Sequence, residues 1–129
     1  MTPLSHFRSA LCKPLFCSAM LLAAASVQVA VSLDHANQER GAADFRARGC
    51  VRCHSITGVG GDRAPDLGRV GLRRSPRQIR TQIIKGGHGM PPFGKTLSAA
   101  EVDDLVAFLS SCHTDDAPGC RTWSDSESK

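Results

Sequence analysis

Two cysteines and a histidine stand close together near the middle of the chain, as Cys50, Cys53 and His54. This C-x-x-C-H spacing is the one that attaches a c-type haem covalently. If the surrounding chain is helical, side chains three and four residues apart project from one face. The two thiols can then bond to one edge of the porphyrin while the imidazole reaches the iron. The motif therefore predicts one covalent haem c, with His54 as a ligand of its iron.

Three other interpretations of the motif are open at this point. A thioredoxin-like dithiol would need a βαβ context, which the pattern of the chain lacks. A zinc site would need a second pair of ligands at matching spacing. The third interpretation is a chance occurrence of the three residues. The segments downstream favour haem over all of these.

A second iron ligand is expected from the segment Gly89-Met90-Pro91-Pro92-Phe93. Two consecutive prolines cannot continue a helix, so they hold the chain extended and leave Met90 to project its thioether from a fixed backbone. The other two methionines, Met1 and Met20, belong to the N-terminal segment. His88 is the competing ligand. Met90 is preferred because the prolines organise it and because methionine with histidine is a known ligand pair of haem iron.

The histidine also needs a partner for its second ring nitrogen. Metal-ligating histidines usually donate that N–H to a backbone carbonyl or a carboxylate, which fixes the plane of the ring. The stretch from Ser55 to Gly68 contains four glycines and is predicted to be a loop. Pro65 within this loop is the candidate that presents its carbonyl to His54. The alternative is that Pro65 only shapes a turn.

Three main helices are predicted to position these residues, so the expected fold class is all-α. The first covers residues 36–48 and ends at Gly49, directly before the motif. The second starts at Ser75-Pro76, stops at Gly86-Gly87 and carries an apolar face of Ile79, Ile83 and Ile84. The third starts at a capping box of Ser98 and Glu101. Its apolar stripe consists of Val102, Leu105, Val106, Phe108 and Leu109.

A glycine inside the first helix predicts a close crossing. Gly41 costs about 1 kcal/mol relative to alanine in a helix, which is tolerable where another backbone passes close by. Phe45, one turn further on, would lie beside this notch. Phe108 of the last helix could enter it, so the first and last helices are expected to be clamped together.

Both ends of the chain lie outside the predicted domain of residues 33–111. Residues 1–32 resemble a signal peptide, with Arg8 and Lys13 before an apolar run, and cleavage is expected between Ala25 and Ser32. Export predicts a periplasmic location, and the alternative is an uncleaved membrane anchor. Residues 112–129 form a polar C-terminal extension. We expect this extension to be mobile, with Trp123 in it.

Two cysteines of the exported chain are left over once the haem motif is complete. An even remainder in an exported protein predicts a disulfide between Cys112 and Cys120. The alternatives are an intermolecular bond or two free thiols. Cys12 and Cys17 fall in the predicted signal peptide and are treated as incidental.

The charge of the chain is uneven. With 16 basic and 12 acidic residues the formal charge is +4. Loss of Arg8 and Lys13 with the signal peptide would leave +2, too close to neutral to predict binding to nucleic acid. No acidic residue lies between Asp66 and Glu101, whereas basic residues are frequent there. A positive face could steer a partner through its acidic face, and the alternative is a merely solvated surface. The protein is expected to be a monomer, with membrane contact only if its N-terminal segment is uncleaved.

Four segments together resemble the class I, monohaem cytochromes c of bacteria: Cys50–His54, the loop at Pro65, the loop at Met90, and the last helix. The resemblance covers roughly residues 34–111. It implies a small all-α fold around one covalent haem c, iron held by His54 and Met90, and a Pro65 carbonyl that orients the histidine. It also implies that an exposed haem edge exchanges electrons with redox partner proteins.

The leading functional hypothesis is a periplasmic one-electron carrier with no enzymatic activity. Two protein ligands would fill both axial positions of the iron and leave no open site for a substrate. One alternative is a cytochrome subunit of a periplasmic dehydrogenase or oxidase complex. The other is a haem-based protein that binds small gases or peroxide, which would apply if Met90 is not a ligand.

Overall fold

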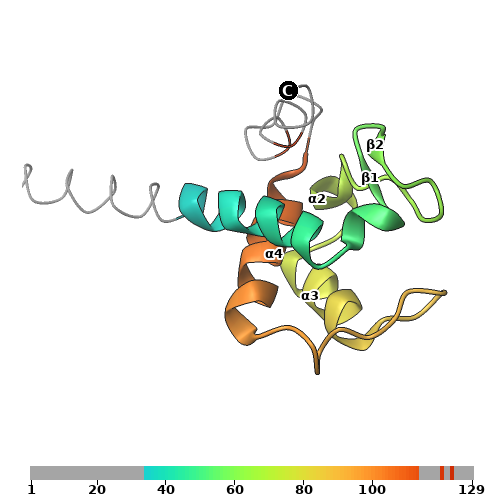
Figure 1. Cartoon of the computed structure of the whole chain (residues 1–129). Helices are drawn as coiled ribbons and strands as arrows, with labels where there is room; N and C mark the ends of the chain where they lie inside the picture. The colour runs from blue at the N-terminus through green and yellow to red at the C-terminus, as the bar shows by residue number, and fades with distance from the viewer. Residues whose placement is uncertain (1–33, 114–119, 121–122, 124–129) are drawn as a thin grey trace, which may run out of the picture. The chain divides into compact units, whose positions relative to one another are not determined.

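The computed structural model describes residues 34–113, Cys120 and Trp123, and helices dominate this part of the chain (Figure 1). Residues 34–47 are helical. The elements that follow are η1 (Cys50–Arg52), β1 (Ser55–Ile56), β2 (Val59–Gly60), α2 (Val70–Arg73), α3 (Pro76–Lys85) and α4 (Ala99–Ser111). The all-α class is confirmed. The predicted signal peptide lies outside the described residues.

The predicted loop after the motif contains a small hairpin that was not expected from the sequence. Strands β1 and β2 pair antiparallel, with Ile56 opposite Val59. The two residues between them have positive φ angles, 50° at Thr57 and 84° at Gly58. Positive φ at both central positions is the turn that matches the twist of a two-residue hairpin. Each strand has only two residues, too few for an alternating pattern to appear in the sequence.

Both later helices begin where the sequence predicts. The Ser75 side chain accepts from Gln78 N, and the Gln78 side chain accepts from Ser75 N in return. Ser98 and Glu101 make the same pair of bonds at the start of α4. The apolar face of α3 is narrower than predicted, because Ile79 and Ile83 are buried whereas Ile84 is 39% exposed.

The helix of residues 34–47 crosses α4 in close contact (Figure 1). A Cβ built on Gly41 would lie 2.0 Å from Asp104 O and 2.7 Å from Phe108 Cβ. The rings of Phe45 and Phe108 meet edge to face, with centroids 5.9 Å apart. Arg40 donates to both carboxylate oxygens of Asp104 beside the crossing. The predicted clamp between the first and last helices is therefore confirmed.

The C-terminal residues differ from the prediction in one respect. Cys112 and Cys120 form the predicted disulfide, with 5.5 Å between their Cα atoms. Trp123, however, is fully buried and packs on Phe45 with 5.3 Å between ring centroids. The expectation of a mobile tail is thus wrong for Trp123. A single large indole in a polar segment gave no periodic signal, although its burial removes much apolar surface from water.

No helix in the described part of the chain combines the length and apolarity needed to cross a membrane.

Candidate functional site

The C-x-x-C-H motif lies on a tight turn rather than on an α-helix. Gly49, with φ 77°, ends the preceding helix, and Cys50–Arg52 form a single 3-10 turn. The His54 N–H still donates to Cys50 O at 3.0 Å, which keeps one helical turn between these two residues. Cys50 is half-buried and Cys53 exposed, and neither thiol is in a disulfide. Burial raises the pKa of the Cys50 thiol, so this thiol is neutral at pH 7.

The imidazole of His54 contacts the carbonyl that the sequence predicts for it. Its Nδ1 lies 2.8 Å from Pro65 O. A carbonyl oxygen only accepts, so Nδ1 carries the proton in this bond and Nε2 is the nitrogen left to bind a metal. Such a partner fixes the ring plane and makes the free nitrogen a better electron donor.

Backbone hydrogen bonds hold the Pro65 loop against the motif. Gly61 N donates to Val51 O at 2.8 Å, and Ala64 N donates to Cys53 O at 2.9 Å. A Cβ at Gly61 would lie only 2.5 Å from Arg52 O, so glycine is what permits this approach. These main-chain contacts hold the segment that carries Pro65 next to the segment that carries His54.

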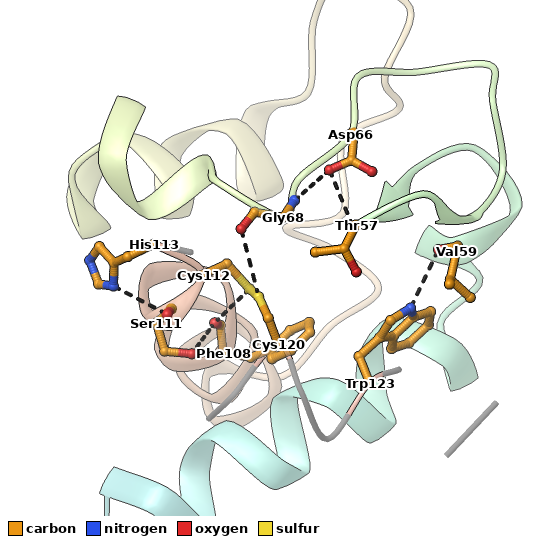
Figure 2. Close-up of a disulfide and its surroundings, with 10 residues drawn as sticks. All are labelled: Thr57, Val59, Asp66, Gly68, Phe108, Ser111, Cys112, His113, Cys120 and Trp123. Atoms are coloured by element: carbon orange, nitrogen blue, oxygen red, sulfur yellow. Dashed lines mark hydrogen bonds between the residues drawn. A yellow bond between two sulfur atoms is a disulfide. The ribbon is translucent and has the colours of Figure 1, made fainter. Parts of the chain in front are cut away.

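One carboxylate that was not predicted from the sequence organises the same loop. Asp66 accepts hydrogen bonds from four groups: Ser55 Oγ at 2.7 Å, Gly58 N at 2.8 Å, Gly68 N at 2.7 Å and Thr57 N at 3.3 Å. Figure 2 shows the bonds from Gly68 and Thr57. Partial burial opposes ionisation of Asp66, but the four donors outweigh it and lower its pKa. The position of Asp66 next to Pro65 in a glycine-rich loop was the available signal.

Met90 and His88 occupy different positions of one tight turn. Gly87 and Met90 exchange both backbone hydrogen bonds, at 2.9 and 3.0 Å. His88 and Gly89 lie between them with φ angles of 52° and 86°. Met90 is half-buried, whereas His88 is exposed. The turn thus brings Met90 back to the body of the protein and leaves His88 at its tip.

The end of α3 anchors the Met90 loop. Phe93 N donates to Ile83 O at 3.0 Å and Gly94 N donates to Ile84 O at 3.2 Å, so the loop satisfies carbonyls at the end of the helix. Gln82 also reaches this loop, with Nε2 3.8 Å from Met90 Sδ. Gln82 is a second residue that was not predicted, since a glutamine on an exposed helix face carries no signal.

These residues fit a c-type haem. Two thiols, an imidazole whose Nε2 is left over and a thioether are the donor set that such a group requires. Among the residues that the structure describes, no group of three or more His, Cys, Asp or Glu side chains is arranged to hold a metal ion.

The sequence of this chain matches one family of known proteins. The family profile described as "Cytochrome C oxidase, cbb3-type, subunit III" matches residues 36–109. Cytochrome c-555 of Methylococcus capsulatus is 32% identical over 66 residues, 50% of this chain and 54% of that protein. Cytochrome c-550 of Bacillus subtilis is 36% identical over 63 residues, 47% of this chain and 48% of that protein.

A third relative is named as part of an enzyme. This relative, a subunit of the nitric oxide reductase of Stutzerimonas stutzeri, is 32% identical over 93 residues, 61% of this chain and 62% of that protein. The chain thus covers less than two thirds of each of these three relatives. No solved structure matches the chain.

Proposed function

We propose that this chain, which belongs to the class I, monohaem cytochromes c, works as an exported one-electron carrier. Its iron would be held by His54 and Met90. The family's cofactor is a covalently bound haem c with its iron. When bound, haem c supplies an iron that alternates between Fe(III) and Fe(II). Every other contribution to electron transfer comes from the chain.

The chain's first contribution is attachment and orientation. Cys50 and Cys53 would hold the group through thioethers, and His54 would bind the iron through Nε2. The bond from His54 Nδ1 to Pro65 O, at 2.8 Å, is the observation that carries the proposal, because it assigns the proton to one nitrogen and the metal to the other. Since the loop is tied to the motif by backbone bonds, these bonds would help to hold the imidazole in one orientation toward the iron.

The second contribution is the sixth ligand. Met90 is supported over His88 by its burial and by the hydrogen bonds that fix its backbone to Gly87. A thioether is a soft ligand and favours Fe(II) more than a second imidazole does. With His54 and Met90 both bound to the iron, the protein would exchange electrons without binding a substrate there.

The partner proposed for this carrier is a redox protein with an acidic docking face. Arg74, Arg77, Lys85 and Lys95 are exposed in the stretch without acidic residues, and Leu72, two residues before Arg74, is 64% exposed. An exposed apolar residue among cations suits a transient interface, in which charge steers the encounter. Export to the periplasm is part of the same proposal and rests on the sequence of residues 1–32.

A second candidate function is a cytochrome subunit of a larger redox enzyme. The observation that favours it is the similarity to an oxidase subunit family and to a reductase subunit. Purification from the native membrane and periplasmic fractions separates the two functions. A free monomer supports the carrier, and stoichiometric recovery with a larger enzyme supports the subunit.

Expression of the full chain in a host that exports and matures c-type cytochromes tests the site. The intact mass of the exported protein should report one covalent haem, loss of the N-terminal segment and the two-proton loss of the Cys112–Cys120 bond. Cys53→Ala should weaken haem staining on a denaturing gel, whereas Cys112→Ala should leave it unchanged. Equal staining of the wild type and Cys53→Ala would reject the attachment site.

A further inference from the structure

Three buried residues after α4 lie against the loop that carries Pro65 (Figure 2). They are Cys112, Cys120 and Trp123, each with none of its surface exposed. We call them the C-terminal clamp. Neither the haem motif nor the resemblance to known cytochromes gives this clamp a role. Its contacts nevertheless reach Val59 and Gly68, on either side of Pro65 in the chain.

Trp123 is held on two sides. Its Nε1 donates to Val59 O at 3.4 Å, on strand β2. The indole also lies under the guanidinium of Arg46, 4.0 Å from the ring centre, and Arg46 Nη2 donates to Trp123 O at 3.2 Å. Together with the edge-to-face contact to Phe45, these interactions leave the indole little freedom. Its hydrogen bond therefore restrains the position of the Val59 carbonyl.

The disulfide contacts the loop at a second point. Cys120 Sγ lies 3.9 Å from Gly68 O. A disulfide sulfur carries no proton, so this is a packing contact and not a hydrogen bond. Gly68 N donates to Asp66 at 2.7 Å, and a Cβ on Gly68 would lie 2.7 Å from the Thr57 methyl group. The segment at Gly68 is thus packed between the disulfide and the hairpin.

The two contact points lie on either side of Pro65 in the chain. Val59 pairs with Ile56, two residues after His54, and Gly68 lies two residues after Asp66, the direct neighbour of Pro65. The C-terminal clamp thus contacts the chain at Val59, before Pro65, and at Gly68, after it. We propose that the C-terminal clamp is a positioning device for the axial histidine, and that Trp123 and the disulfide set the strength of the His54–Pro65 hydrogen bond. This inference rests on the proposed function insofar as His54 ligates the iron.

Trp123→Phe in the holoprotein tests the inference, because phenylalanine keeps an aromatic ring and removes the N–H that Val59 O accepts. We expect the Nδ1 proton of His54 to exchange with deuterium about two- to tenfold faster in the Fe(II) protein, the change that loss of one neutral hydrogen bond corresponds to. The midpoint potential should rise, because a weaker bond at Nδ1 makes the imidazole a poorer donor to Fe(III). The double variant Cys112→Ser/Cys120→Ser should change both quantities in the same direction and by more.

Ile79→Val is the matched control, since it removes one methyl group from a buried core residue of a different element, α3. It should lower stability but leave Nδ1 exchange and potential unchanged. The inference is overturned if Trp123→Phe leaves Nδ1 exchange unchanged, or if Ile79→Val alters both quantities to the same extent. The assignment of His54 as an iron ligand is tested separately. A His54→Gly protein with the wild-type haem spectrum would reject that assignment. Comparison of Nδ1 exchange between the wild type and Trp123→Phe would still test the C-terminal clamp.

Discussion

The carboxylate of Asp66 holds together the hairpin and the loop that follows it. Its carboxylate accepts hydrogen bonds from strand β1, from the turn of the hairpin and from Gly68, and so ties the hairpin to the segment that follows Pro65. Ionised acceptors make stronger hydrogen bonds than neutral ones, which explains why four donors point at this group. The geometry of the neighbouring Pro65 carbonyl depends on this arrangement.

Asp66→Asn should lower the free energy of unfolding at pH 7 by about 1 kcal/mol, allowing for solvent screening of a partly exposed charge. The folded pKa of Asp66 is below its ordinary value, so its stabilising effect is complete above the unfolded pKa of about 3.9 and is lost as the pH falls through the folded pKa. Denaturant titrations of both proteins between pH 7 and pH 2 should therefore show the difference shrinking below about pH 4. A difference that is constant across this range would contradict the assignment.

Gln82 should tune the iron through Met90. A hydrogen bond to the thioether withdraws electron density from sulfur, so Gln82→Leu should make Met90 a better donor to Fe(III) and lower the potential. A weak bond of about 0.5–1 kcal/mol corresponds to about 20–40 mV for one electron. Voltammetry of the immobilised protein measures the shift. Thr81→Val, on the neighbouring exposed position of α3, is the control and should leave the potential unchanged; a Gln82→Leu potential equal to or above the wild type would refute the role.

At the scale of elements, the crossing at Gly41 decides whether the two long helices can meet. Helix propensity alone says that Gly41→Ala should stabilise the protein by about 1 kcal/mol and that Ala43→Gly, at an exposed position nearby, should destabilise it by the same amount. The contact of 2.0 Å between a Cβ at Gly41 and Asp104 O reverses the first expectation. We expect Gly41→Ala to lose about 1–3 kcal/mol or more, because the helices must separate. Thermal unfolding of both variants checks this, and stabilisation by Gly41→Ala would show that the helices can separate at little cost.

The sequence predicts the elements that have strong local signals. Ser75 and Ser98 mark the starts of α3 and α4 because a hydroxyl before a helix accepts an orphan backbone N–H. The apolar stripe of α4 and the notch at Gly41 together predict the main helix contact. The contact between His54 and Pro65 is also predicted, because a metal-binding imidazole needs an acceptor for its second nitrogen.

Other features escaped prediction for physical reasons. The hairpin depends on positive φ angles at Thr57 and Gly58, and threonine gives little sign of such a conformation. Burial of Trp123 depends on contacts with Arg46 and Phe45, more than seventy residues away in sequence, which no local pattern encodes. The identities of the iron ligands remain predictions, since they depend on how the chain closes around the haem.

At the scale of the whole protein, the separation of charge along the chain predicts its behaviour with partners. The rate of electron transfer to an acidic redox protein should fall as the ionic strength rises from about 0.01 to 0.15 M, where the Debye length shortens from about 30 to 8 Å. Arg74→Gln/Arg77→Gln should reduce the rate at low salt and flatten its salt dependence. Arg48→Gln is the control, because Arg48 already pairs with Glu101. Stopped-flow kinetics measure all three proteins, and equal salt dependence would place the docking face elsewhere.

In the proposed carrier His54 and Met90 would both hold one iron and leave it no open position for a substrate. The most direct test is the weak absorption band at the red edge of the visible spectrum that reports a thioether on Fe(III). We predict this band in the wild-type holoprotein at neutral pH and in His88→Ala, and its loss in Met90→Ala, which should retain covalent haem and bind added cyanide or imidazole. Absence of the band from the wild type, or its persistence in Met90→Ala, would contradict the ligation of iron by Met90. It would also contradict the proposal that two protein ligands leave the iron no open position for a substrate.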